Sequence, residues 1–345
     1  MNIDPSEQDP HSKRLLKVCD LDRDIPEEAV RRARRAYYGA VSYVDDNVGK
    51  LLAILKDTKM VENTIVIFSA DHGDMLGERN LWYKMSWFEG SARIPLIIHN
   101  PRSFGPSRIS DNVSTLDILA TLVDLAGGRV DDRLPLDGRS LVPQCKGQPG
   151  VNEVFGEYCG EGTVTPYMMI KRGSHKYITC PADPPQLFDL ASDPHELRNL
   201  MLEVDTRPEI RALADQFQQE AERRWDFKAV HEQVLRQQRM RRLCWDALKQ
   251  GRFEAWDYQP RERAQDMYVF NFPLFRFLPP ISLHFASPHI IILHRYTLMR
   301  QFIRYIRSHM PLDELELRAR YPPVDEWGRE KKRGDARGVA AAYGQ

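Results

Sequence analysis

Three side chains with metal-binding chemistry follow one hydrophobic run in the first third of the sequence. Asp71, His72 and Asp74 come directly after residues 64–70, which are apolar or small. Such a run is typical of a strand covered on both faces, and ligands bind at the carboxyl ends of strands in open α/β sheets. Carboxylates suit Ca²⁺ or Mg²⁺, and imidazoles are accepted more readily by Zn²⁺ or Mn²⁺. Gly73 removes a side chain where we expect a sharp turn. Two interpretations stay open: a metal site, or a polar turn that closes the strand.

A lysine in the following loop extends the first interpretation. Lys84 lies a short stretch beyond the cluster. An ammonium group that returns to a metal site is a natural partner for an anionic substrate oxygen. The alternative is a solvated surface charge, which is the common state of a lysine.

Several runs, taken in order, resemble one enzyme family. Residues 36–46, residues 63–76, Lys84 and residues 93–97 are similar to the type I sulfatases of the alkaline phosphatase superfamily. The choline sulfatases in particular share three further features. These are a His after the metal-type Asp, the run Gly-Glu-Tyr-Cys-Gly-Glu at 156–161, and residues 245–260. The resemblance covers residues 1–265 and a short piece at 308–325.

The resemblance implies a reaction and a set of roles. The reaction is hydrolysis of choline-O-sulfate to choline and sulfate. Asp71 and His72 match metal ligands, with Ca²⁺ expected and Mg²⁺ or Mn²⁺ as alternatives, and Lys84 matches a sulfate-binding residue. Glu161 matches the carboxylate that binds the quaternary ammonium group, which needs charge and aromatic faces. Its alternative is an exposed loop carboxylate, and Asp313 in the tail is a second candidate for the ammonium.

The nucleophile of the family has no counterpart among the cysteines. The resemblance implies a formylglycine, made from Cys or Ser in a Cys/Ser-x-Pro/Ala-x-Arg motif. None of the five cysteines has this context: Cys19, Cys145, Cys159, Cys180 and Cys244. The upstream pair of Asp ligands is missing too. We therefore expect this chain to correspond to the later part of a sulfatase and to be inactive alone.

Composition places the chain among ordinary globular proteins. It has 345 residues, of which 42% are hydrophobic and 28% charged. Because the formal net charge is zero, no general field draws it to nucleic acid or an anionic membrane. The cysteines are odd in number, widely spaced and without paired ligand spacing, which favours reduced thiols and a cytoplasmic location. The first residues carry no apolar core of the signal-peptide kind.

The periodicity predicts an α/β fold. Residues 1–25 show no period and contain prolines, which predicts an extended loop. A long amphipathic helix begins after Pro26, and strands at 64–70 and 94–99 precede a helix that begins near Leu116. We interpret residues 26–145 as a partial catalytic domain. It would hold the C-terminal part of a doubly wound, parallel sulfatase-type sheet.

A second domain is predicted at residues 150–265. Short alternating runs near 154–158, 167–170, 176–179 and 186–190 indicate a small antiparallel sheet. The run Asp-Pro-His-Glu at 193–196 resembles a sulfatase turn that we expect to be structural. Two amphipathic helices, near 208–225 and 230–248, follow this turn.

The last part of the sequence departs from this pattern. Residues 266–307 are apolar without a clean period, and their prolines and charges argue against a membrane span. We interpret 269–303 as an insertion foreign to the family. The tail, 308–345, resembles the segment through which choline sulfatases form oligomers, so a homo-oligomer is expected. Two other functions stay open: a phosphonate or phosphate monoester hydrolase of the same superfamily, and a non-catalytic remnant that binds a partner.

Overall fold

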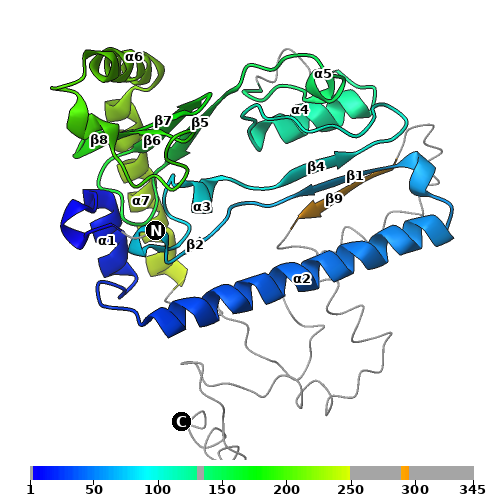
Figure 1. Ribbon diagram of the computed structural model, residues 1–345, viewed down its shortest axis with the longest axis horizontal. Helices are drawn as coiled ribbons and strands as arrows, with labels where there is room; N and C mark the ends of the chain where they lie inside the picture. The colour runs from blue at the N-terminus through cyan, green and yellow to red at the C-terminus, as the bar shows by residue number, and fades with distance from the viewer. Residues whose placement is uncertain (1–2, 130–135, 249–288, 295–345) are drawn as a thin grey trace, which may run out of the picture. The chain divides into compact units, whose positions relative to one another are not determined.

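The computed structural model describes residues 3–129, 136–248 and 289–294 (Figure 1). Its elements in chain order are η1 (Pro5–Glu7), α1 (Pro10–Val18), α2 (Glu27–Asp57), η2 (Val61–Asn63), β1 (Thr64–Ser69), β2 (Met75–Leu76), η3 (Glu78–Asn80), β3 (Trp82–Tyr83), α3 (Glu89–Ala92), β4 (Leu96–His99), α4 (Leu116–Leu125), α5 (Val142–Cys145), β5 (Glu153–Tyr158), β6 (Tyr167–Arg172), β7 (His175–Cys180), β8 (Asp183–Asp189), η4 (Leu200–Glu203), α6 (Pro208–Arg224), α7 (Phe227–Leu248) and β9 (His289–His294). Elements η1 to α7 lie in the first of two compact units, Met1–Ile292. The mixture of helices and sheets confirms the predicted α/β class.

The first sheet has the strand order β4-β1-β9. β1 is buried along most of its length and pairs with β4 in antiparallel register, with Ile67 opposite Ile98. This direction corrects the parallel sheet that we predicted. Parallel neighbours need a crossover connection, usually a helix that packs on the sheet. The chain between β1 and β4 instead forms the short β2–β3 hairpin and the four-residue helix α3.

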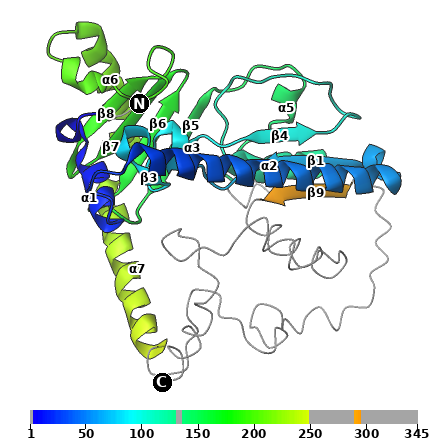
Figure 2. The same ribbon diagram turned by 60° about the horizontal axis from the view of Figure 1, so that its bottom comes forward.

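The long helix α2 confirms the predicted amphipathic helix. Pro26 precedes it, and Glu27 and Glu28 in its first turn favour the positive end of the helix dipole. Both views show α2 running alongside β1 and β4 (Figure 2). Near its start, Arg34 donates to the Leu76 carbonyl oxygen at 3.0 Å. The helix is thereby fastened to the β2–β3 hairpin.

Helix α1 corrects the prediction of an extended loop over residues 1–25. The Asp9 carboxylate accepts hydrogen bonds from the backbone nitrogen of Ser12 at 3.0 Å and from its hydroxyl at 2.6 Å. Pro10 occupies the first turn, where its fixed φ suits a helix. Asp followed by Pro is thus a helix-start signal that the search for periodicity overlooked, because the helix has only nine residues.

The second sheet has the antiparallel order β5-β6-β7-β8, as predicted. Alternation along β6 sends Met168 and Ile170 into one hydrophobic cluster, where they pack with residues of α6. Tyr167 and Met169 enter a second cluster on the other face, together with Phe88 from the segment after β3. The loop that carries Lys84 is therefore held against this sheet.

Several predictions fall on residues outside the described ranges. Asp313, the tail 308–345 and most of the segment 266–307 are among them. β9 lies within the segment that we interpreted as an insertion. Among the described residues, none of the helices has the length and apolar character that a membrane crossing requires.

Candidate active site

The end of β1 places Asp71 and His72 at the surface next to each other. The strand is buried up to Ser69 and Ala70, and the two polar side chains follow. The backbone nitrogen of His72 donates to Asp71 Oδ1 at 3.0 Å, which turns the carboxylate toward the imidazole. Asp71 Oδ2 then lies 3.5 Å from His72 Nε2. Two potential metal ligands therefore share one small region.

Position 73 requires a glycine because the backbone of α3 packs closely against it, in addition to the turn there. The backbone nitrogen of Gly73 donates to the Ser91 carbonyl oxygen at 2.7 Å. A Cβ at position 73 would lie 2.2 Å from the carbonyl oxygen of Gly90. Any larger residue would push α3 away from the end of β1.

Hydrogen bonding selects the tautomer of His72. Its Nδ1 lies 2.7 Å from the carbonyl oxygen of Gly73, which can only accept, so Nδ1 carries the hydrogen. The lone pair of Nε2 is then available, and the Lys84 ammonium donates to it at 3.0 Å. A histidine that donates one N–H to a backbone carbonyl and offers the other nitrogen is arranged as metal-ligating histidines are.

The loop between β3 and α3 holds Lys84 in place. The Ser91 hydroxyl donates to the carbonyl oxygen of Lys84. Further along this loop, the Trp87 carbonyl oxygen accepts from the ammonium of the buried Lys176 on β7 at 2.7 Å. The side chain of Lys84 itself is exposed. A rigid backbone thus carries a charged side chain that a ligand can reach.

Glu161 lies within the electrostatic reach of Lys84. The Tyr158 hydroxyl donates to Glu161 Oε2 at 2.8 Å. The pKa of Glu161 is lowered by its own backbone N–H, by the Tyr158 hydroxyl and by the positive charge of Lys84. Burial and the carboxylate raise the pKa of Tyr158 well above its ordinary value, so its hydroxyl stays a donor. The positive charge of Lys84 therefore acts on Glu161.

Two further aromatic rings pack on Tyr158, the partner of this carboxylate, and the sequence analysis did not single them out. Trp87 meets Tyr158 edge to face, with ring centroids 6.5 Å apart, and His11 does so at 6.3 Å. Trp87 follows Lys84 closely in the chain, so an aromatic side chain in that loop was a readable signal. His11 carried no such signal, because it comes from a distant helix.

The side chains after β1 fit, in part, the divalent ion that the resemblance implies. Two ligand atoms 3.5 Å apart can both contact one ion, since Ca²⁺–oxygen distances are about 2.4 Å. Asp71 and His72 therefore fit as two ligands of such an ion. Over residues 3–129, 136–248 and 289–294, no group of three or more His, Cys, Asp or Glu side chains is arranged to hold a metal. Among the described residues, Asp71 and His72 would make up only part of the coordination shell of such an ion.

Family models match most of the chain. The model described as Sulfatase matches residues 5–128, and the one described as N-sulphoglucosamine sulphohydrolase, C-terminal, matches residues 77–223. A third, Choline sulfatase enzyme C terminal, matches residues 232–273. Choline-sulfatase of Rhizobium meliloti is 39% identical over 318 residues, which are 92% of this chain.

This chain belongs to the sulfatase family.

The chain spans 54% of the length of that choline-sulfatase. It is also 39% identical to arylsulfatase K of Danio rerio over 184 residues, which are 50% of this chain and 35% of that protein. Solved structures agree with the sulfatase fold. A putative sulfatase from Bacteroides thetaiotaomicron is 26% identical at a TM-score of 0.54, covering 64% of this chain and 51% of that one. The phosphonate monoester hydrolase of Agrobacterium radiobacter is 26% identical at 0.52, covering 60% and 43%.

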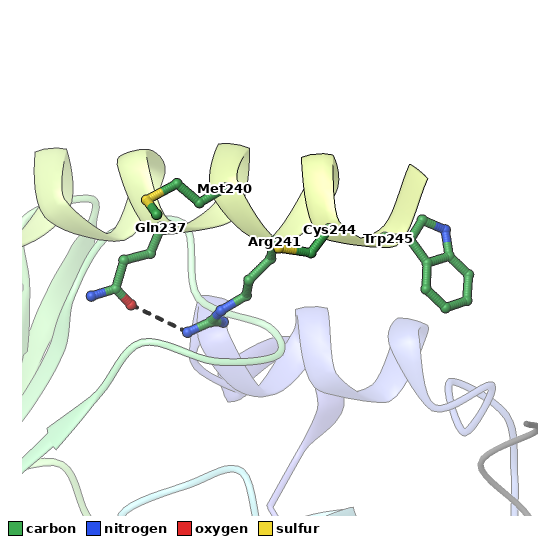
Figure 3. Close-up of a pocket in the computed structure, with 5 residues that line it drawn as sticks. All are labelled: Gln237, Met240, Arg241, Cys244 and Trp245. Carbon is green, nitrogen blue, oxygen red and sulfur yellow. Dashed lines mark hydrogen bonds between the residues drawn. The ribbon is translucent and has the colours of Figure 1, made fainter. Parts of the chain in front are cut away.

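A hollow on α7 shares no lining residue with the candidate site around Asp71, His72 and Lys84. Gln237, Met240, Arg241, Cys244 and Trp245 line it (Figure 3). Arg241 donates to Gln237 Oε1 at 3.3 Å, so its charge is engaged within the helix. The hollow is formed by side chains of one helix, and none of the predicted site residues lines it.

Proposed function

We propose that this chain takes part in sulfuric ester hydrolysis and that its site binds choline-O-sulfate. The observation that carries this proposal is the position of Lys84. Its ammonium lies 3.0 Å from His72 Nε2, and its charge also lowers the pKa of Glu161. A cation and a carboxylate whose charges act on each other support a ligand with an anionic sulfate end and a cationic trimethylammonium end.

Each charged residue of the site binds the end of the substrate that carries the opposite charge. Lys84 donates hydrogen bonds to the sulfate oxygens and neutralises their charge, which is worth more where a bound substrate excludes water. Glu161 attracts the trimethylammonium group, and the faces of Tyr158 and Trp87 offer cation–π contact to a group that cannot donate a strong hydrogen bond. A divalent ion held by Asp71 and His72 would supply Lewis-acid stabilisation of the sulfate oxygens.

The attacking group is not assigned to a residue of this chain. Each cysteine among the described residues is a free thiol, and none stands in a Cys-x-Pro/Ala-x-Arg context. The proposal therefore concerns substrate and metal binding by this chain. Hydrolysis requires a nucleophile in addition.

A second candidate is hydrolysis of phosphonate or phosphate monoesters. The structural likeness to the phosphonate monoester hydrolase of Agrobacterium radiobacter favours it. Lys84 and the two ligands accept any tetrahedral anion, so they do not separate the candidates. Glu161 does, because a carboxylate attracts a cationic leaving group, repels an anionic one and offers a neutral one no charge attraction.

Calorimetric titration of the full chain in Ca²⁺ tests the proposal. We expect choline-O-sulfate to bind at least about tenfold more tightly than phenyl methylphosphonate or phenyl sulfate, because only it has a cationic end. Sulfate release is followed in parallel, with the choline-sulfatase of Rhizobium meliloti as the active control. Equal affinities for the three esters would refute the choline assignment. No affinity for any of them would refute the proposed function itself.

A further inference from the structure

Helix α1 reaches both loops of the candidate site through one buried imidazole. His11 is 1% exposed and stacks on the ring of Tyr167, with centroids 4.2 Å apart. Its Nε2 lies 2.7 Å from the carbonyl oxygen of Met85, and its Nδ1 lies 3.2 Å from the carbonyl oxygen of Gly162. Met85 is the neighbour of Lys84 in the chain, and Gly162 is the neighbour of Glu161. The two edges of one ring therefore contact the backbone carbonyls of the residues that follow Lys84 and Glu161.

A second residue of α1 strengthens the hold on Gly162. Arg14 Nε donates to the carbonyl oxygen of Gly162 at 2.6 Å, and its guanidinium also pairs with Asp183 on β8, with Nη1 at 3.0 Å from Oδ1. Gly162 has a φ of +81°, and a Cβ there would lie 2.6 Å from Leu15 Cδ2. The turn after Glu161 is thus pressed against α1, and its conformation depends on that contact.

We propose that His11 is a positioning residue that fixes the separation of Lys84 and Glu161. Both carbonyls that it contacts belong to loops, and loops are free to move unless their backbone polar groups are engaged. A ligand with an anionic and a cationic end gains affinity only if its two partners stand at the matching distance. This consequence for ligand binding rests on the proposed function, whereas the structural role does not.

Two variants separate the hydrogen bonds from the packing of the ring. His11→Phe keeps an aromatic ring against Tyr167 and removes both polar contacts. His11→Gln loses the ring and restores an amide donor toward the Met85 carbonyl. Lys17→Ala, on the exposed side of α1, is the matched control.

Amide hydrogen exchange of the full chain, read by mass spectrometry, tests the structural role. In His11→Phe we expect exchange at least about tenfold faster in peptides that cover 83–86 and 160–163, since each loop loses its polar contact with the imidazole. Peptides from β6 and β7 should be unchanged. In His11→Gln the 83–86 peptide should return toward the wild-type rate. Unchanged exchange in both loops of His11→Phe would overturn the proposal, and so would an equal increase throughout the sheet.

Ligand titration tests the consequence. We expect His11→Phe to weaken choline-O-sulfate about tenfold while choline alone and inorganic sulfate alone keep their affinities, because each of them meets one loop only. Equal weakening of all three ligands would contradict positioning. If the wild-type chain binds none of them, the proposed function fails, and the exchange rates still decide the role of His11.

Discussion

At the scale of single residues, two opposite charges define the candidate site. Lys84 donates to His72 Nε2, and Glu161 accepts from the Tyr158 hydroxyl at 2.8 Å. Neither side chain is buried, so each can change partner when a ligand arrives. Their effects on binding should therefore be separable by ligand charge.

Lys84→Met and Glu161→Gln should change the selectivity between sulfate and choline in opposite directions. Loss of Lys84 should weaken inorganic sulfate about tenfold and leave choline nearly unchanged, because a charged hydrogen bond contributes roughly 1.5–3 kcal/mol. Glu161→Gln, which preserves the shape of the side chain, should weaken choline binding and leave the affinity for inorganic sulfate nearly unchanged. Calorimetry with the two ligands measures both effects. Parallel losses for both ligands in either variant would contradict the separate roles.

At the scale of elements, buried ion pairs fasten the site loop to the second sheet. Lys176 on β7 is buried, and its ammonium lies 2.8 Å from Glu89 Oε1 and 2.7 Å from Glu196 Oε1. Burial raises the pKa of Glu89, but the charges of Lys176 and Lys171 lower it further, so it stays below its ordinary value. Glu196 also accepts from the Glu89 backbone nitrogen at 2.7 Å. The predicted structural turn at 193–196 thus contributes a buried carboxylate to α3.

Lys176→Met should be among the most destabilising substitutions of this region. It leaves two carboxylates facing each other without their shared cation, and breaking a buried pair costs about 3–5 kcal/mol. Lys171→Met is the matched control, since Lys171 contacts Glu89 alone at 3.0 Å and should cost about 1 kcal/mol. Urea unfolding measures the difference. An equal loss of unfolding free energy in the two variants would show that the burial of Lys176 does not increase the cost of removing its charge.

The ion pair between α1 and β8 should give a defined pH dependence. Arg14 holds the pKa of Asp183 below its ordinary value, chiefly by hydrogen bonding. Because the folded-state pKa is the lower one, this stabilisation is present above the unfolded pKa and is lost as pH falls through the folded pKa. Asp183→Asn should therefore lower the free energy of unfolding by about 2 kcal/mol at pH 7 and at pH 5.

The difference between wild type and Asp183→Asn should shrink chiefly below about pH 4, where an unfolded aspartate is roughly half protonated. Denaturant titrations at several pH values measure it. A difference that already fell between pH 7 and pH 5 would exclude Asp183 as its source.

At the scale of the molecule, large apolar side chains remain exposed on the elements around the first sheet. On α2 they include Tyr38 at 68% and Val41 at 52%, on α4 Leu116 at 56%, and on β4 Ile97 at 60%. β4 stands at one end of the described strand order, so its outer edge offers unpaired backbone groups. Such an edge favours association between chains.

Ile97→Lys should reduce self-association of the isolated chain. A charge on an exposed edge strand opposes edge-to-edge pairing, and an exposed position should tolerate it within about 0.5 kcal/mol. Light scattering over a concentration series measures the effect. As control, Val18→Lys changes an exposed apolar residue of α1, away from any sheet edge. An equal effect of both substitutions would mean that general solubility, and not the β4 edge, controls association.

The sequence by itself determined the chemistry at the end of β1, the long helix α2 and the second antiparallel sheet. These features are local, because motif spacing and hydrophobic period depend on neighbouring residues. The tertiary structure alone decided the antiparallel pairing of β1 with β4 and the effect of the Lys84 charge on Glu161. Strand direction follows from the connection between strands, and the two charged loops both contact the ring of His11, which lies far from both in the chain. Such contacts form only when distant segments have packed, so no pattern of neighbouring residues records them.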